Sequence, residues 1–244
     1  YDAGLSAGRI KCWGRNTSGQ VGNGDPSAVP ENVLVAQDVC WSGYDSTCHR
    51  LTEAVDVSAT VVSSCAIVNG RPYCWGSNQN GVLQSQPHFD PQPHPQSLQP
   101  NDGVTALGAC GPSSAVSVLR GNELWSWGQN GFGLIANGST GEDVLTPAQA
   151  CLDKQCNSFA ADVSSVACGG TFSCSVRGDG VYCWGNNSAG GLGLGEIGTP
   201  ASQPFIGEPA IAGGAAQVSV SGSHACAVID GGRLRCWGSN TNGE

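Results

Sequence analysis

The chain has 244 residues, a formal net charge of −9 and a charged fraction of only 12 %. Its 10 lysines and arginines form no cluster, so the composition disfavours binding to nucleic acid or to an anionic membrane surface. No apolar run approaches the length of a membrane span. The 37 glycines suit many tight turns between short strands better than they suit long helices.

The number and spacing of the cysteines indicate the cellular compartment in which the protein works. The chain has 13 cysteines but no pair separated by two residues, and its 4 histidines are scattered. This pattern disfavours zinc ribbons, thioredoxin-like redox sites and Cys/His metal cages, so we expect no metal and no cofactor. Structural disulfides in an oxidising compartment are the better interpretation, which predicts an extracellular or cell-surface protein.

A Trp-Gly pair recurs five times at intervals of about 50 to 60 residues, a spacing typical of propeller blades. An asparagine lies three positions after each tryptophan and a glycine six positions after it. Asparagine and glycine both tolerate a left-handed backbone, so this pattern predicts a turn and no catalytic role. The repeats are centred on Trp13, Trp75, Trp127, Trp184 and Trp237.

The first repeat has an unpaired cysteine and a short insertion. Cys12 precedes its tryptophan with no cysteine upstream, so we expect its partner to lie before Tyr1. Cys40 and Cys48 then close the segment CWSGYDSTC, which presents Trp41 and Tyr44. Aromatic residues on a closed loop suit a protein-binding hot spot, whereas the alternative is that Trp41 only covers the flank of the fold.

The second repeat predicts a disulfide-stapled hairpin. Asn69-Gly70 is a strong signal for a two-residue turn, and folding about it places Cys65 opposite Cys74. This is a non-hydrogen-bonded pair with Cα atoms about 4.5 Å apart, within reach of a disulfide. The Trp is a core residue that ends the strand.

A Pro-rich segment, residues 86–100, follows this hairpin and is predicted to be an extended loop insertion. It offers His88 and Phe89 as further protein-binding candidates. The segment could also be a packing strip between subunits, a site of proline modification or a solvated loop.

The third, fourth and fifth repeats have similar hairpins but differ in their cysteines. In the third repeat, Val116 and Ser126 are predicted to hold the places of the missing cysteines. Cys151 and Cys156 close a second short loop, whereas Cys110 and Cys168 either pair or are free thiols on neighbouring inner strands. Further hairpin disulfides are predicted for Cys174 with Cys183, about Gly178-Asp179, and for Cys226 with Cys236, about a three-residue loop.

Three sequons are candidate N-glycosylation sites. They begin at Asn137, Asn186 and Asn16, of which the last also holds the turn position of its repeat.

Short β-branched runs precede each hairpin, so each repeat predicts about four short strands and the chain an all-β fold. The strings CWGRNTSGQVGNG (residues 12–24) and CWGNNSAGGLGLG (residues 183–195) resemble the repeat of the regulator-of-chromosome-condensation family. The resemblance covers nearly the whole chain, residues 1–244, and implies a single β-propeller, which in this family usually has seven blades. About four and a half repeats are present, so a closed propeller would need two to three more.

The resemblance favours a binding module without catalysis. A cysteine before the tryptophan also makes the chain similar to the secreted, disulfide-stapled ectodomains of crinkly-type receptor kinases, and a bacterial β-lactamase-inhibitor propeller is a more distant relative. The nuclear exchange-factor activity of the founding member suits neither the charge nor the compartment. We therefore expect an extracellular propeller that binds a protein partner. The alternatives are a self-assembling structural glycoprotein of a wall, matrix or appendage and, third, a secreted enzyme or inhibitor.

Overall fold

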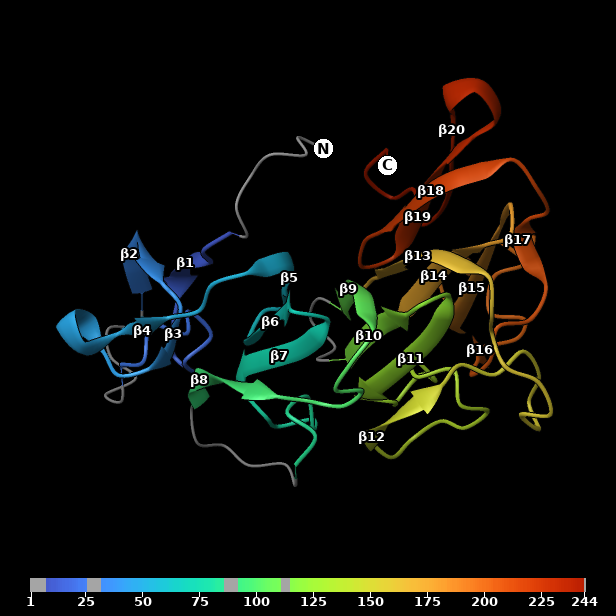
Figure 1. Cartoon of the computed structure of the whole chain (residues 1–244). Coiled ribbons are helices and arrows are strands. Elements are labelled where there is room, and N and C mark those ends of the chain that lie inside the picture. Colours follow the sequence, from blue (N-terminus) through green and yellow to red (C-terminus); the bar gives the residue numbers. More distant parts are fainter. Residues whose placement is uncertain (1–7, 26–31, 86–91, 111–114, 244) are drawn as a thin grey trace.

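Five antiparallel sheets follow one another along the chain and around an arc, from blue to red in Figure 1. This computed structural model describes residues 8–25, 32–85, 92–110 and 115–243, except for the side chains of residues 109 and 110. No helix in these ranges is long and apolar enough to cross a membrane. The all-β propeller class predicted from the sequence is confirmed, and we number the sheets as blades I to V.

Blades II and III have the four predicted strands, and the other blades depart from that number. Blade I consists of β1 (Lys11–Arg15) and β2 (Asn32–Asp38). Blade II consists of β5 (Ala54–Ala59), β6 (Ser63–Val68), β7 (Arg71–Gly76) and β8 (Gln92–Ser97). Blade III consists of β9 (Val104–Cys110), β10 (Ala115–Arg120), β11 (Glu123–Gly128) and β12 (Val144–Gln149). Blade IV consists of β13 (Val163–Cys168), β14 (Phe172–Arg177), β15 (Gly180–Asn186), β16 (Ser202–Gln203) and β17 (Pro209–Ile211). Blade V consists of β18 (Ala215–Val220), β19 (His224–Ile229) and β20 (Arg233–Gly238), with the short helix η3 (Asp230–Gly232) in its hairpin.

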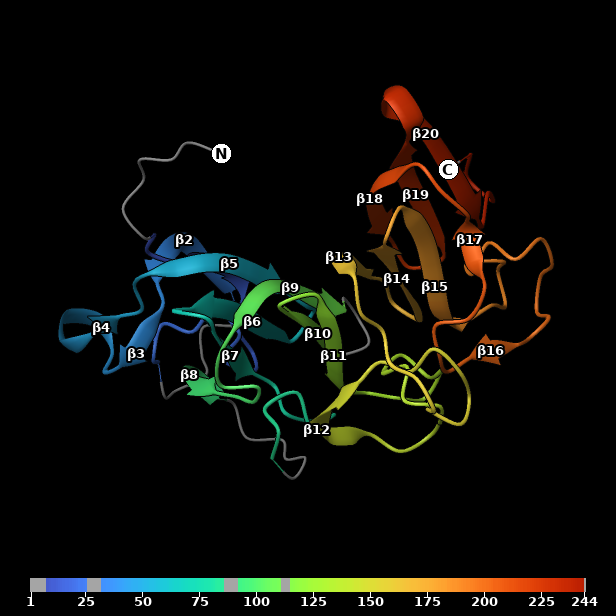
Figure 2. The ribbon, with the colours of Figure 1, turned by 45° about the vertical axis from the view of Figure 1, so that its right-hand side comes forward.

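A small extra hairpin joins blades I and II. It comprises β3 (Cys40–Ser42), the 3₁₀ turn η1 (Asp45–Thr47) and β4 (His49–Arg50). Both Figure 1 and Figure 2 show it projecting from the outer side of blade I.

The hairpin register predicted for blade II is confirmed. Cys65 lies opposite Cys74, Ile67 opposite Pro72, and the turn is at Asn69-Gly70. The Cα atoms of the two cysteines are 4.0 Å apart and their sulfurs are bonded. The other predicted pairs are also bonded in the structure: Cys40–Cys48, Cys151–Cys156, Cys174–Cys183 and Cys226–Cys236.

Blade III corrects one sequence-based alignment. The residue opposite Ser126 is Ser117, and Val116 lies opposite Trp127. The error arose because the hairpin turns on two residues, Gly121-Asn122, which moves the partner strand by one position. The two serine hydroxyl groups are 2.8 Å apart and buried, so a hydrogen bond replaces the hairpin disulfide of blades II, IV and V.

The tryptophans of blades II to V each tie their blade to the blade before it. In blades II to V the indole Nε1–H donates to the backbone carbonyl seven positions after the preceding repeat's tryptophan. In three of these blades the ring is also completely buried, so the hydrogen bond is formed in an apolar surrounding. The four bonds are Trp75 to Gln20 (2.9 Å), Trp127 to Val82 (2.8 Å), Trp184 to Leu134 (2.8 Å) and Trp237 to Gly191 (2.9 Å).

The repeated asparagine shapes the turn that presents this carbonyl. In blade II, Oδ1 of Asn78 accepts from the backbone N–H of Leu83 at 2.7 Å, and Gly81 donates to the Asn78 carbonyl at 3.1 Å. Gly81 has φ +72°, which favours glycine. The same side-chain bond recurs in blades I, III and IV, from Val21 to Asn16, from Ile135 to Asn130 and from Leu192 to Asn187.

Trp13 departs from the expectation that every repeat tryptophan is a core residue. Its side chain is 67 % exposed, whereas Trp75, Trp127 and Trp184 are fully buried. The reason is its position in blade I, because the part of the chain that the structure describes has no preceding repeat to pack on that face.

The predicted loop insertion at residues 86–100 is partly wrong. Residues 92–97 form β8, the outer strand of blade II, paired with β7. Proline is tolerated there because an edge strand leaves one row of N–H groups without ladder partners. His88 and Phe89 lie outside the described residues.

We predict that replacing Trp127 by Phe lowers the free energy of unfolding by about 2–3 kcal/mol, because the buried Val82 carbonyl loses its donor and the ring leaves a small void. Trp125→Phe is the control, since the indole of Trp125 donates to the exposed carboxylate of Glu123 and its ring is only partly buried, so it should lower stability by no more than about 1 kcal/mol. Urea unfolding followed by far-UV circular dichroism measures both. Equal effects of the two substitutions would contradict the role given to the inter-blade bond.

Candidate protein-binding surface at the Cys40–Cys48 loop

The loop closed by Cys40 and Cys48 is held to the propeller at its base. The N–H of Cys40 donates to the Gly22 carbonyl at 2.7 Å, and His94 Nδ1 lies 3.1 Å from the Cys40 carbonyl. A Cβ on Gly24 would collide with the Gly43 carbonyl, so the loop and the exit turn of blade I pack backbone against backbone. The loop is therefore a rigid support for the side chains that it carries.

The two predicted aromatic residues occupy different places on this support. Trp41 is 45 % exposed and packs edge-on against Tyr73 of β7, with ring centroids 4.9 Å apart. Tyr44 is also 45 % exposed and caps η1, where the Thr47 hydroxyl donates to its carbonyl at 2.8 Å. Trp41 therefore contacts the flank of blade II while part of its side chain faces solvent, and its role in protein binding stays a prediction.

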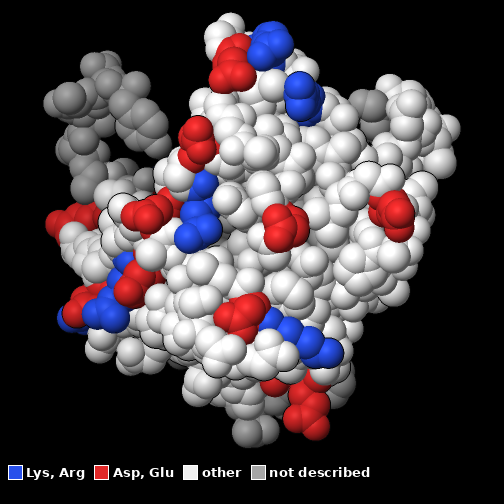
Figure 3. All heavy atoms as spheres, turned by 90° about the vertical axis from the view of Figure 1, so that its right-hand side faces the viewer, with Lys and Arg blue, Asp and Glu red and all other residues white. Residues whose placement is uncertain are grey.

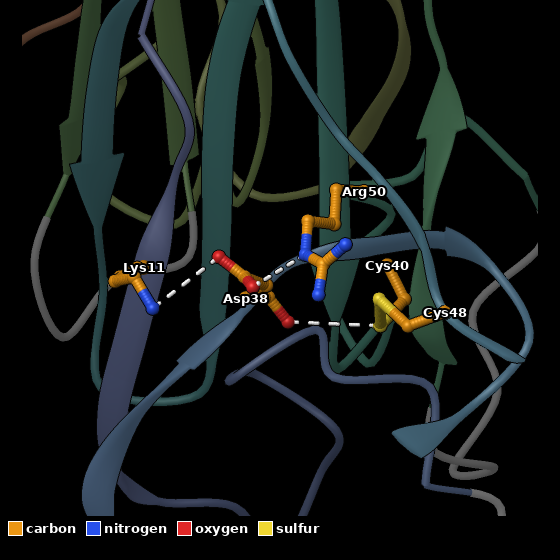
Figure 4. Close-up of polar contacts among 5 residues, drawn as sticks. All are labelled: Lys11, Asp38, Cys40, Cys48 and Arg50. Atoms are coloured by element: carbon orange, nitrogen blue, oxygen red, sulfur yellow. Dashed lines mark hydrogen bonds and ion pairs between the residues drawn. A yellow bond between two sulfur atoms is a disulfide. The ribbon is translucent and has the colours of Figure 1, made fainter. Parts of the chain in front are cut away.

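Charged side chains surround the base of the loop (Figure 4). Nε of Arg50 lies 2.6 Å from Asp38, and Nζ of Lys11 lies 3.4 Å from the other carboxylate oxygen. The hydrogen bond from Arg50 and the charge of Lys11 hold the pKa of Asp38 below its usual value. The negative charge of Asp25, together with a hydrogen bond to it, raises the pKa of Tyr44 above its usual value.

A polar hollow of about 180 Å³ lies beside the loop. Its walls include Asn23, Asp38, Tyr44 and Arg50. This volume is below the ~300 Å³ at which pockets for drug-sized ligands begin. The hollow is therefore too small to enclose such a ligand. No group of three or more His, Cys, Asp or Glu side chains within the described ranges could hold a metal ion.

Blade III carries a second disulfide loop in the equivalent position. The N–H of Cys151 donates to the Ala136 carbonyl at 2.7 Å, as that of Cys40 does to Gly22, and both acceptors lie nine positions after their tryptophans. The backbone of Phe159 pairs with Cys151, and its side chain is 47 % exposed. Sequence reasoning missed Phe159, which lies three residues after Cys156 and therefore outside the loop that the disulfide closes.

The three sequons differ in accessibility. Asn16 is fully buried and its carboxamide closes the turn, so a glycan there is incompatible with this packing. Asn137 and Asn186 are half-buried, and each accepts a hydrogen bond from the N–H two residues later, of Ser139 and Ser188. Only these two remain proposed acceptors.

The structure decides for one of the two inner-strand cysteines, Cys110 and Cys168, whether it is a free thiol. Cys168 is disulfide-bonded, which excludes the alternative of a free thiol for that residue. The side chain of Cys110, its proposed partner, lies outside the described residues.

Surface charge is sparse on the face drawn in Figure 3. Most of the lysine and arginine side chains there lie next to acidic side chains, and uncharged surface lies between these small groups. That face therefore offers no basic patch for a nucleic acid backbone.

Comparison with known proteins assigns the repeat. The profile of the regulator of chromosome condensation (RCC1) repeat matches residues 122–176, and a second profile of this repeat matches residues 163–190 and 215–244. Residues 122–190 and 215–244 thus carry RCC1 repeats. The fold agrees, since the structure of Prp20p from Saccharomyces cerevisiae superposes with a TM-score of 0.75 at 16 % identity, covering 97 % of this chain and 55 % of that one.

Curated proteins with RCC1-like sequence extend the comparison. The ultraviolet-B receptor UVR8 of Arabidopsis thaliana is 27 % identical over 97 % of this chain, and the human E3 ubiquitin-protein ligase HERC2 is 26 % identical over 98 %. The RCC1-repeat chain spans 50 % of the length of UVR8 and 5 % of HERC2. Among the structural relatives, Prp20p binds Gsp1p and histones.

We predict that the double substitution Cys40→Ser with Cys48→Ser exposes the loop to chymotrypsin. A disulfide stabilises by about 2–4 kcal/mol, so cleavage after Trp41 or Tyr44 should accelerate at least tenfold once the loop can open locally. Mass spectrometry of the fragments gives the cleavage rate at each site. Cys151→Ser with Cys156→Ser is the matched control and should leave cleavage at the first loop unchanged. Rapid cleavage of the intact loop would show that it is not rigid.

Proposed function

We propose that this RCC1-repeat chain is a protein-binding propeller module that works outside the cell and has no catalytic role of its own. The observation that carries the proposal is the pair Trp41 and Tyr44, each 45 % exposed on a loop held by a disulfide and by backbone hydrogen bonds. Large aromatic rings on a rigid support lose little conformational entropy when they bind, and they dominate many protein interfaces.

The chemistry of the surrounding surface supports a protein partner. The hollow beside Tyr44 is polar and has Arg50 and Asp38 on its walls, so an inserted side chain can form hydrogen bonds there. Trp41 supplies apolar contact area next to it. This combination of an aromatic anchor and a polar rim is typical of interfaces that form and dissociate.

The disulfides support the extracellular part of the proposal. Five lie within the described residues, three of them as hairpin staples and two as loop closures. Such a density is common in secreted proteins and rare in reducing compartments. Asn137 and Asn186 are the proposed N-glycosylation sites in that setting.

The structural-glycoprotein alternative is weakened by β8. Residues 92–97 are paired with β7 inside blade II, so of this half of the Pro-rich segment only the outer strand edge is left to pack against another subunit.

Selection from a peptide-display library on the immobilised chain tests the proposal. We expect the enriched peptides to bind the Trp41→Ala, Tyr44→Ala double variant at least tenfold more weakly, since hot-spot truncations cost about 2 kcal/mol or more. Phe132→Ala is the matched control, because Phe132 is 42 % exposed in a turn of blade III. Circular dichroism verifies that both variants fold. Peptides that lose binding only with Phe132→Ala would contradict the assignment of this loop.

A further inference from the structure

Blade III holds its disulfide loop in the same way as blade I holds the Cys40–Cys48 loop. Gly24 and Gly138 lie at the same distance along the chain from the tryptophans of their repeats. The N–H of Gly24 donates to the Pro93 carbonyl at 3.2 Å, and that of Gly138 donates to the Pro204 carbonyl at 2.8 Å. A Cβ on either glycine would collide with the backbone of the neighbouring disulfide loop. The residues around the two loops therefore occupy equivalent places.

Asn137 occupies in blade III the place of Asn23 in blade I, because each directly precedes its glycine. Asn23 is 8 % exposed and lines the polar hollow beside the first loop. Asn137 is half-buried and begins a sequon. A group attached to Asn137 therefore leaves the chain beside the second loop, where the hollow lies in blade I.

Phe159 occupies the place of Arg50. Cys40 pairs with Arg50 across the first loop, and Cys151 pairs with Phe159 across the second. In both loops the next residue donates its N–H, at 2.8 Å, to the carbonyl that precedes the first cysteine. Arg50 lines the same hollow as Asn23. By this equivalence, the ring of Phe159 flanks the place next to Asn137.

The carboxamide of Asn137 can carry a substituent without losing a hydrogen bond. Its Oδ1 accepts from the N–H of Ser139 at 3.2 Å, from the Ser139 hydroxyl at 2.8 Å and from Nδ2 of Asn130 at 3.3 Å. Within the described part of the chain, Nδ2 of Asn137 donates to no acceptor. This nitrogen is the atom that N-glycosylation modifies.

We propose that Asn137 carries an N-linked glycan whose first sugar packs on the ring of Phe159 and covers the second disulfide loop. The inference rests on the proposed extracellular function, because N-glycosylation takes place in the secretory pathway. Nδ2 loses one proton and bonds to C1 of the first N-acetylglucosamine, and the lipid pyrophosphate that carried the oligosaccharide leaves. The apolar face of the sugar then removes part of the Phe159 ring, which is 47 % exposed, from water.

Such a glycan makes the two loops different. The hollow beside the Cys40–Cys48 loop stays open to a partner, whereas the equivalent place in blade III is filled. Phe159 is otherwise an exposed aromatic residue next to a second rigid loop, and a partner could bind it in error. Covering it restricts binding to the first loop.

The chain secreted from insect cells tests the proposal. Mass spectrometry of its peptides gives the occupancy of Asn137, and an endoglycosidase trims the glycan to a single N-acetylglucosamine. We expect chymotrypsin to cleave after Phe159 at least about fivefold more slowly in the trimmed chain than in Asn137→Gln or Ser139→Ala, because the sugar hinders access when the segment opens locally. Asn186→Gln is the matched control, since it removes the other candidate sequon and should leave this cleavage unchanged.

A second measurement separates packing from simple shielding. Nuclear Overhauser effects between the N-acetyl methyl group and the ring protons of Phe159 should appear in the trimmed chain and vanish in Phe159→Ala. An unoccupied Asn137 in a secreted chain with its disulfides formed would overturn this inference and leave the proposed function standing. An occupied Asn137 without these contacts, or with equal cleavage rates, would overturn it as well. A chain retained in the cell with reduced cysteines would contradict both proposals.

Discussion

The bond from an indole N–H to a carbonyl of the preceding repeat is the interaction on which the rest of the structure depends. It joins Trp127 to Val82, and it recurs with the same spacing in blades II, IV and V. The carbonyl is presented by a turn that the repeated asparagine closes, as Asn78 does through Leu83. Tryptophan, asparagine and glycine therefore form one unit that spans two blades, which explains why they recur together in the sequence.

The hairpin disulfides are not required for the folded shape of a blade. Blade III has no hairpin disulfide, yet Trp127 is as buried as Trp75 and Trp184 in the stapled blades. The hydrogen-bonded serines 117 and 126 fill the place of the cysteines. A staple restricts the unfolded hairpin more than it shapes the folded one. The loop disulfides differ, because they fix the chain where Trp41 and Tyr44 leave the blade.

Sequence reasoning reached the parts of the fold that depend on local turn chemistry. Asn69-Gly70 determined the register of its hairpin, and with it the pairing of Cys65 with Cys74. Sequence reasoning failed where the conformation of a segment depends on a neighbouring blade or strand. Trp13 has the same local sequence as the buried tryptophans but no preceding blade in the described structure, and residues 92–97 become a strand only because β7 offers an edge.

The candidate site was predictable in outline only. The spacing of Cys40 and Cys48 indicated a closed loop with two aromatic residues. The contact of Trp41 with Tyr73 and the effect of Asp25 on Tyr44 join residues far apart in the sequence, so no local pattern could indicate them.

Hydrogen exchange of the individual indole N–H groups, measured by NMR, tests the inter-blade bond most directly. The account predicts slow exchange for Trp75, Trp127 and Trp184, whose buried N–H groups bind carbonyls of the preceding blade. It predicts fast exchange for Trp13, whose ring is exposed. Exchange of the Trp127 N–H as fast as that of Trp13 would contradict the account.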